Sequence, residues 1–167
     1  ALPPLDVRWH EIPDDGGSEV PVDRDGQERM FRDSAVSLSD AAKEKRATMR
    51  ARIAKAKEIV DESPEDSFIL WHDLEDERRE IKRQMPDAVE VYGSQDLDER
   101  ERRIVGFSDG EFRLLATKPI LSGSGCNFQR HCHREIFTGV GFKFNDFIQS
   151  IHRVYRFLQT EHVRIDI

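Results

Sequence analysis

The feature that most constrains the fold is a regular alternation of short apolar runs and longer charged segments, which starts at residue 67. The apolar runs are about four to six residues long, as expected of buried strands, and the charged segments are about twelve residues long, as expected of helices. Such alternation is typical of βαβ units, whose right-handed crossovers build a parallel sheet. The sequence therefore predicts an α/β fold with a doubly wound parallel sheet.

The expected elements follow the chain in order. The predicted strands are residues 5–12, 67–71, 88–92, 112–116, 135–138 and 162–167. The predicted helices in the alternating part are residues 73–84, 97–107 and 144–157. Because ligands bind such sheets at the carboxyl ends of the strands, we expect one working edge. It would hold residues 71–72, 92–93 and 117–118 and the glycine-rich loop 121–127.

The first sixty residues do not show this alternation of short apolar runs and charged segments. After the strand that follows Pro3 and Pro4, residues 13–30 are expected to form an exposed loop, and a helix capped by Ser37 or Ser39 should run to about residue 60. This helix is strongly basic and carries a thin apolar stripe, made of Ala47, Ile53, Ala54, Ile59 and Val60. A thin stripe predicts a helix on a surface or between domains. We therefore divide the chain into an extension, residues 1–62, and a domain, residues 63–167.

Charge and length exclude several classes of protein. The chain has 167 residues and a net charge of −7, which excludes a wholly basic nucleic-acid coat. The net charge does not exclude a local basic surface, because lysine and arginine are concentrated in residues 43–57. There is no apolar run of about 18 residues, so no membrane partner is expected. With no signal-peptide pattern and only two cysteines, the chain is predicted to be cytoplasmic.

The sharpest candidate site is in the last predicted helix. Gln149, Arg153 and Arg156 are spaced by four and three residues, so they would share one helical face. Two neighbouring guanidinium groups repel each other unless an anion lies between them, and a triphosphate is such an anion. The alternative is a solvated basic face of an amphipathic helix, and these residues alone leave both interpretations open.

A second candidate site combines a strand end with the loop that follows it. Thr117 and Lys118 directly follow a predicted strand, and Gly123 and Gly125 would let backbone amides approach a phosphate closely. Asn127 could orient a ligand. The alternative is an ordinary turn, because a single Gly-x-Gly is weak evidence.

Two absences from the sequence limit its chemistry. The pattern G-x-x-x-x-G-K-[ST] does not occur, so no Walker A loop can hold the β and γ phosphates of a nucleotide. The cysteines and histidines of residues 126–133 lack the paired spacing of a zinc site, and nothing fixes a base for a nucleophilic cysteine. The chain is therefore predicted to hold no metal site of its own and at most half of a nucleotide site.

Taken together, these segments resemble the second RecA-like lobe of superfamily 2 helicases, and most closely the Swi/Snf-like translocases found in phage and restriction-associated ATPases. The resemblance covers residues 67–167. The segments that carry it, in the family's order, are residues 67–72 (motif IV), 91–107 (the stretch that follows), 114–128 (motif V), 149–159 (motif VI) and 162–167 (the strand after it). Gln149, Arg153, Arg156 and Gln159 are in register with motif VI.

The chain departs from the family pattern in three places. Leu158 stands where the family usually has glycine, and Pro119, Ile120 and Leu121 replace small residues early in motif V. The basic helix over residues 40–60 has no counterpart that we can map.

The resemblance implies the second motor lobe of an ATP-dependent helicase or translocase. ATP and Mg²⁺ would be held mainly by an N-terminal RecA-like lobe of the same full-length protein, so that this lobe would be inactive alone. Arg153 and Arg156 would be arginine fingers, the catalytic residues. The other residues of the ATP site would be Gln149, Gly123, Gly125 and Asn127.

The resemblance also implies a nucleic-acid partner, with DNA as the expected substrate. The residues that would contact its phosphate backbone are His72, Ser94, Thr117 and Lys118. The alternative function is a non-catalytic helicase-like module that docks nucleic acid or protein through the basic helix.

Overall fold

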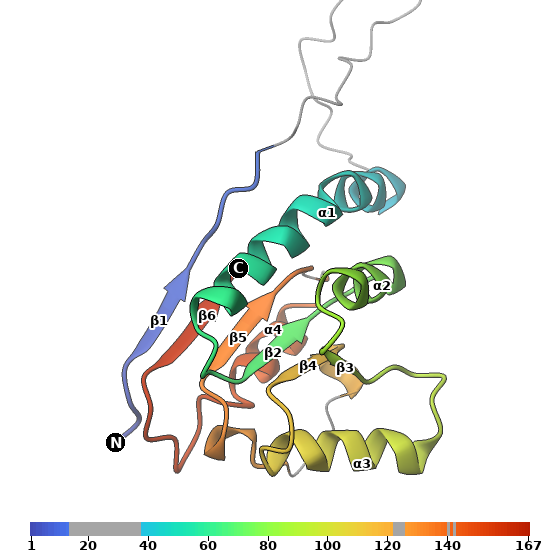
Figure 1. The fold of residues 1–167 in the computed structure, drawn as a ribbon. Helices are drawn as coiled ribbons and strands as arrows, with labels where there is room; N and C mark the ends of the chain where they lie inside the picture. Colours follow the sequence, from blue (N-terminus) through green and yellow to red (C-terminus); the bar gives the residue numbers. More distant parts are fainter. Residues whose placement is uncertain (14–37, 122–125, 140, 142) are drawn as a thin grey trace, which may run out of the picture.

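One parallel sheet, in the strand order β1-β6-β5-β2-β4-β3, organises the molecule (Figure 1). The computed structural model describes residues 1–13, 38–121, 126–139, 141 and 143–167. Every pair of neighbouring strands in the sheet is parallel. The strands are β1 (Leu5–Arg8), β2 (Phe68–Trp71), β3 (Val89–Glu90), β4 (Leu114–Thr117), β5 (Arg134–Phe137) and β6 (Val163–Asp166).

Helices cover both faces of this sheet, because alternate side chains of the buried strands point to opposite sides. On one face, Phe68 and Leu70 of β2 pack in a cluster with α1 (Leu38–Glu62) and α2 (Glu75–Gln84). On the other face, Ile69 and Trp71 pack with α3 (Leu97–Ser108) and α4 (Phe144–Ile151). Figure 1 shows the two layers of helices. The predicted α/β fold with a doubly wound parallel sheet is therefore confirmed.

Several elements are shorter than predicted. The first strand ends at Arg8, and β3 has only two residues. The expected loop over residues 13–30 lies, from residue 14 on, outside the described residues. No helix in the described ranges is long and apolar enough to cross a bilayer.

The basic helix α1 belongs to the core of this fold. Ile53, Ile59 and Val60 are buried against the sheet and α2, as part of the predicted stripe. The prediction is wrong for the other two residues of that stripe, because Ala47 and Ala54 are exposed. Ala56 is buried instead. The helix therefore covers one face of the sheet and does not merely lie on the surface.

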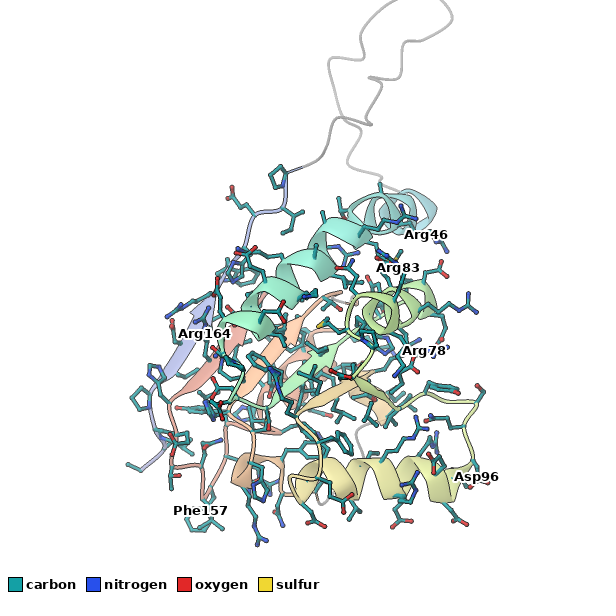
Figure 2. The ribbon with its side chains drawn as sticks, in the orientation of Figure 1. Arg46, Arg78, Arg83, Asp96, Phe157 and Arg164 are labelled. Carbon is teal, nitrogen blue, oxygen red and sulfur yellow. The ribbon has the colours of Figure 1, made fainter. Side chains whose placement is uncertain are left out.

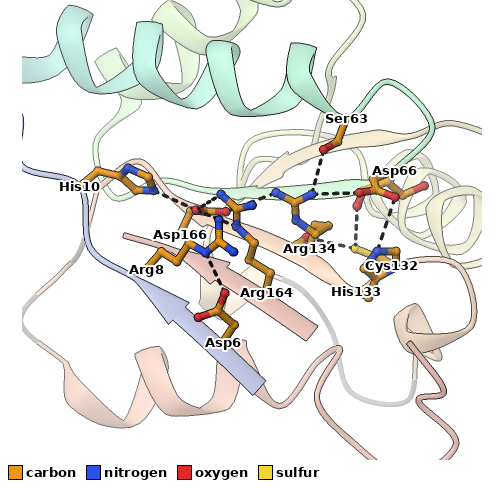
Figure 3. Close-up of polar contacts among 11 residues, drawn as sticks. Asp6, Arg8, His10, Ser63, Asp66, Cys132, His133, Arg134, Arg164 and Asp166 are labelled. Carbon is orange, nitrogen blue, oxygen red and sulfur yellow. Dashed lines mark hydrogen bonds and ion pairs between the residues drawn. The ribbon is translucent and has the colours of Figure 1, made fainter. Parts of the chain in front are cut away.

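A network of charged side chains ties β1 to the rest of the sheet (Figure 3). Asp166 of β6 is fully buried, and its carboxylate lies 2.9 Å from His10 Nε2 and 3.0 Å from Arg164 Nη2. Arg134 of β5 extends the network by donating to Asp66 at 2.9 Å. A buried carboxylate without such partners would be strongly destabilising. The network therefore fixes the N-terminal strand at this edge of the sheet.

Another buried acid lies on the opposite face of the sheet. Glu135 of β5 is fully buried and accepts a hydrogen bond of 2.8 Å from Trp71 Nε1. Its second oxygen has no hydrogen-bond partner within the described ranges. Burial raises the pKa of Glu135 to about 8, although the Trp71 hydrogen bond and the charge of Arg153 oppose this shift. The side chain is therefore mostly protonated at neutral pH.

The packing of α1 can be tested with Ile53→Ala. We expect the free energy of unfolding to fall by about 2–5 kcal/mol, because a fully buried side chain is replaced by a cavity. Urea denaturation measures the change. The control is Ala54→Ser on the exposed side of the same helix, with an expected change of about 0.5 kcal/mol or less. Equal effects of the two substitutions would show that α1 does not pack on the sheet.

The raised pKa of Glu135 predicts a pH dependence of stability. Between the ordinary pKa of 4.5 and the folded value of about 8, the folded state binds more protons than the unfolded state. The stability that Glu135 contributes is therefore fully present below pH 4.5 and is lost as the pH rises through about 8. Glu135→Gln cannot ionise, so the variant should gain stability relative to the wild type as the pH rises across this range.

Thermal or urea unfolding of both proteins as a function of pH measures this difference. Glu65→Gln, at an exposed carboxylate, is the matched control and should show no such trend. A difference between Glu135→Gln and the wild type that stays constant with pH would contradict the prediction.

Candidate nucleotide and nucleic-acid site

The structure brings together three of the predicted nucleic-acid residues at the carboxyl ends of β2 and β4. Trp71 is paired with Thr117 in the parallel register, and the backbone N–H of His72 donates to the Thr117 carbonyl at 3.2 Å. The next residue, Lys118, is close enough to His72 for its charge to affect the histidine. The two loops that leave these strands therefore share one edge.

These three side chains differ in what they can offer a ligand. The His72 ring is 1% exposed, and neither ring nitrogen has a hydrogen-bond partner in the part of the chain that the structure describes. Burial, and then the Lys118 charge, lowers the pKa of His72 to about 4, so the ring is neutral at physiological pH. Thr117 is fully buried. Lys118 is half-exposed, 3.8 Å from Glu75 Oε1, and is the cation of this group.

Ser94, the fourth residue of the predicted nucleic-acid set, is exposed in the loop between β3 and α3. Because β3 pairs with β4 in parallel, this loop leaves the sheet at the same edge. Ser94 thus lies two strands away from His72 in the sheet order β2-β4-β3.

A fully buried carboxylate positions the loops of this edge. Glu77 of α2 accepts the backbone N–H groups of Asp73 at 2.8 Å and Leu74 at 2.9 Å. Arg52 of α1 donates to its other oxygen at 3.0 Å. The backbone at Gly139, after β5, lies so close that an added Cβ would overlap the Glu77 carboxylate. Glu77 therefore joins α1, the loop after β2 and the loop after β5.

The arrangement of the predicted arginine site differs from the expectation. The helix α4 ends at Ile151, so only Gln149 is helical, and Arg153 and Arg156 lie in the turns that follow. The prediction that all three share one helical face is wrong. Leu158 stands at the position where the helicases that the sequence resembles usually have glycine. Its φ is 71°, which lies in the left-handed region.

A buried glutamine explains why the helix stops. The side-chain amide of Gln159 donates to the carbonyls of Val154 at 3.1 Å and Cys132 at 3.0 Å. This pair of bonds folds the chain back on itself and joins it to the segment before β5. A tertiary contact therefore overrides the helical spacing of the sequence.

Both arginines remain available to an anion. Arg156 is exposed, with Nη1 3.5 Å from the Cys126 carbonyl. Arg153 is half-buried; burial raises the pKa of both Cys126 and Glu135, and the Arg153 charge opposes both shifts. Neither guanidinium forms an ion pair with a described residue.

The end of the glycine-rich loop lies beside these turns. Gln129 Nε2 is 3.5 Å from Asn127 Oδ1 and 3.4 Å from the carbonyl of Phe157. The structure therefore brings Asn127 next to the segment that carries the arginines. Gln149 is exposed on α4, and Gly123 and Gly125 lie outside the described residues.

Three residues that organise this site were not found from the sequence. They are Glu77, Gln129 and Glu135, which are polar residues at fully or nearly fully buried positions. No motif or spacing marks them, because their partners come from distant segments. Within the described ranges, no group of three or more His, Cys, Asp or Glu side chains could hold a metal ion.

Comparisons with known proteins give matches among solved structures only, since no family model and no curated protein sequence matches the chain. The C-terminal part of the Fun30 ATPase domain is 17% identical, with a TM-score of 0.60, over 70% of this chain and 40% of that chain. Domain 2 of the DEAD-box helicase Mss116p, bound to an RNA duplex, is 16% identical, with a TM-score of 0.57, over 72% of this chain and 49% of that one.

A third match is the C-terminal domain of S. cerevisiae Dbp5 bound to Gle1 and IP6, which is 14% identical with a TM-score of 0.56. The alignment covers 71% of this chain and 69% of the Dbp5 chain. At identities this low, the matches show the fold alone. The chain has the fold of a C-terminal RecA-like helicase lobe.

Proposed function

We propose that this chain is the second motor lobe of an ATP-dependent nucleic-acid helicase or translocase, with DNA as its substrate, and that it is inactive without a first lobe. The observation that carries the proposal is the pair of arginines without acidic partners among the described residues. They lie beside the end of the glycine-rich loop, on the fold of a C-terminal helicase lobe.

The charge of the arginine site fits the polyphosphate of ATP. Two guanidinium groups near one another are unfavourable without a counter-ion, and arginine pairs with phosphate oxygens in a bidentate way. ATP, which with Mg²⁺ would be held mainly by the first lobe, would supply the phosphoryl group that is transferred to water. Arg153 and Arg156 would stabilise the charge that develops on this group, while Asn127 and Gln149 would line the cleft.

The carboxyl edge fits the phosphate backbone of a nucleic acid. Lys118 supplies the positive charge, and Ser94 is an exposed hydroxyl at the same edge. The connection from β4 to β5 begins with Lys118 and passes Cys126 and Asn127 before it reaches β5. One connection thus runs from the nucleic-acid edge to the arginines, and it offers a path by which closure of the two lobes around ATP would move the bound strand.

The alternative is a non-catalytic module that docks nucleic acid or protein through α1. The basic residues of this helix favour it, and one of them, Arg46, is exposed (Figure 2). However, several of its cations already have acidic partners, which weakens their attraction for a polyanion. These pairs are Arg46 with Asp76, Arg52 with Glu77, Lys55 with Glu58 and Lys57 with Asp61.

The proposal predicts that Arg153→Gln and Arg156→Gln, each in the full-length protein, lower nucleic-acid-stimulated ATP turnover by about 10³-fold or more. The reason is that an arginine finger acts on the transition state. Nucleic-acid binding should be largely retained, because neither side chain lies at the carboxyl edge. Steady-state ATPase assays and fluorescence anisotropy measure the two quantities.

Arg79→Gln is the matched control, since it removes the same charge from an exposed position on α2, across the sheet. It should leave turnover unchanged. Unchanged turnover in both arginine-finger variants would refute the motor function and favour the docking module.

A further inference from the structure

A cavity of about 330 Å³ lies at the carboxyl ends of β2 and β5, against the first turn of α4. Much of its wall is apolar and partly aromatic. Phe137 and Phe147 have ring centroids 4.8 Å apart, and Pro119 and Ile120 face them from the connection after β4. A wall of this kind suits a flat, apolar-faced group.

Two large apolar side chains are exposed at or next to the lining of the cavity. Ile120, which is part of its lining, is 77% exposed. Phe144 is 71% exposed and follows Lys143, another lining residue. Large apolar side chains held in water beside a cavity indicate a surface that binds something.

His72 gives this wall its polar feature. His72 is one of the lining residues, its side chain is almost fully buried, and neither ring nitrogen has a hydrogen-bond partner among the residues described. A buried polar group without partners is costly, so its presence calls for a ligand that satisfies it. With a pKa lowered to about 4 by burial, the ring is neutral and offers one donor and one acceptor.

The charges of the lining cancel. Lys118 and Lys143 are matched by Asp73 and Asp146, and the neutral imidazole adds no charge. A phosphate inside this cavity would gain little from electrostatics. A neutral ligand with a flat ring and a polar edge fits the chemistry better.

We propose that this cavity takes one unstacked nucleobase from the strand that passes the carboxyl edge. The inference rests on the proposed function, which places nucleic acid at this edge, and extends it from contacts with the backbone to a contact with a base. The base would lie against the apolar wall and turn its hydrogen-bonding edge toward His72. A single neutral imidazole gives little discrimination between bases, so the pocket would hold a base without reading a sequence.

The test compares two oligonucleotides of about 10 residues with the same backbone charge, one of thymidine and one entirely abasic. Fluorescence anisotropy gives the affinity of the chain for each. Because stacking of one base contributes measurably to binding, the thymidine strand should bind about 5-fold or more tightly than the abasic strand. A ratio near one, with both strands bound, would overturn the base pocket and leave backbone binding intact.

Two variants locate the effect. His72→Leu should bring the ratio close to one, while the melting temperature stays at or above that of the wild type, since an unsatisfied buried ring is replaced by an apolar side chain. Ile120→Ser, at an exposed position in the lining, should lower the ratio without unfolding the chain. Val105→Ser on α3 is the control and should keep the wild-type ratio. Wild-type ratios in His72→Leu and Ile120→Ser would overturn the proposal.

A third arm separates this inference from the proposed function. If neither strand binds, the nucleic-acid function fails, and free adenosine decides whether the cavity still takes a base. Adenosine that shifts the NMR signals of the Phe147 and His72 rings would support a pocket for a free base. Unshifted ring signals would overturn the inference.

Discussion

The parallel pairing of β2 with β4 on one side and β5 on the other is the constraint on which the other features depend. Its register aligns Trp71 with both Thr117 and Phe137. The pairing continues one residue further, because His72 donates to the Thr117 carbonyl at 3.2 Å and Thr138 donates to the Trp71 carbonyl at 2.9 Å. Three loops therefore leave the sheet side by side. A slip of one residue would turn every side chain of β2 to the opposite face and dismantle this edge.

The two candidate sites depend on different kinds of interaction. The carboxyl edge is built by the sheet register and by the buried carboxylate of Glu77, which accepts backbone N–H groups of the loop after β2. The arginine site is held by side-chain amides, since Gln129 and Gln159 bind carbonyls of separate segments. The first arrangement is part of the core. The second depends on a few hydrogen bonds between turns, which suits the surface that we propose meets another lobe.

Much of the fold follows from local patterns in the sequence, and the site follows only in part. Short apolar runs between charged segments predict the strands and helices, because a four-residue apolar run such as that of β2 has the length of a buried strand and is too short for a buried helix. The end of α4 could not be predicted, because the spacing of Gln149, Arg153 and Arg156 is helical. Gln159 imposes the turn, because its side-chain amide donates to the carbonyl of Cys132, 27 residues earlier in the chain. The left-handed backbone conformation of Leu158 is the second cause. Long-range partners of this kind leave no periodic signal.

The reach of Glu77 has a consequence for how this lobe is put together. Its carboxylate is fully buried, balanced by Arg52 of α1 and pressed against Gly139. Loss of the helix would strip the counter-ion from an enclosed negative charge, which is far more costly than the loss of packing alone. The α1 part of the N-terminal extension is thus an integral part of the fold. A protein with another sequence in its place would need either a new cation next to Glu77 or a different conformation of the loops that Glu77 holds.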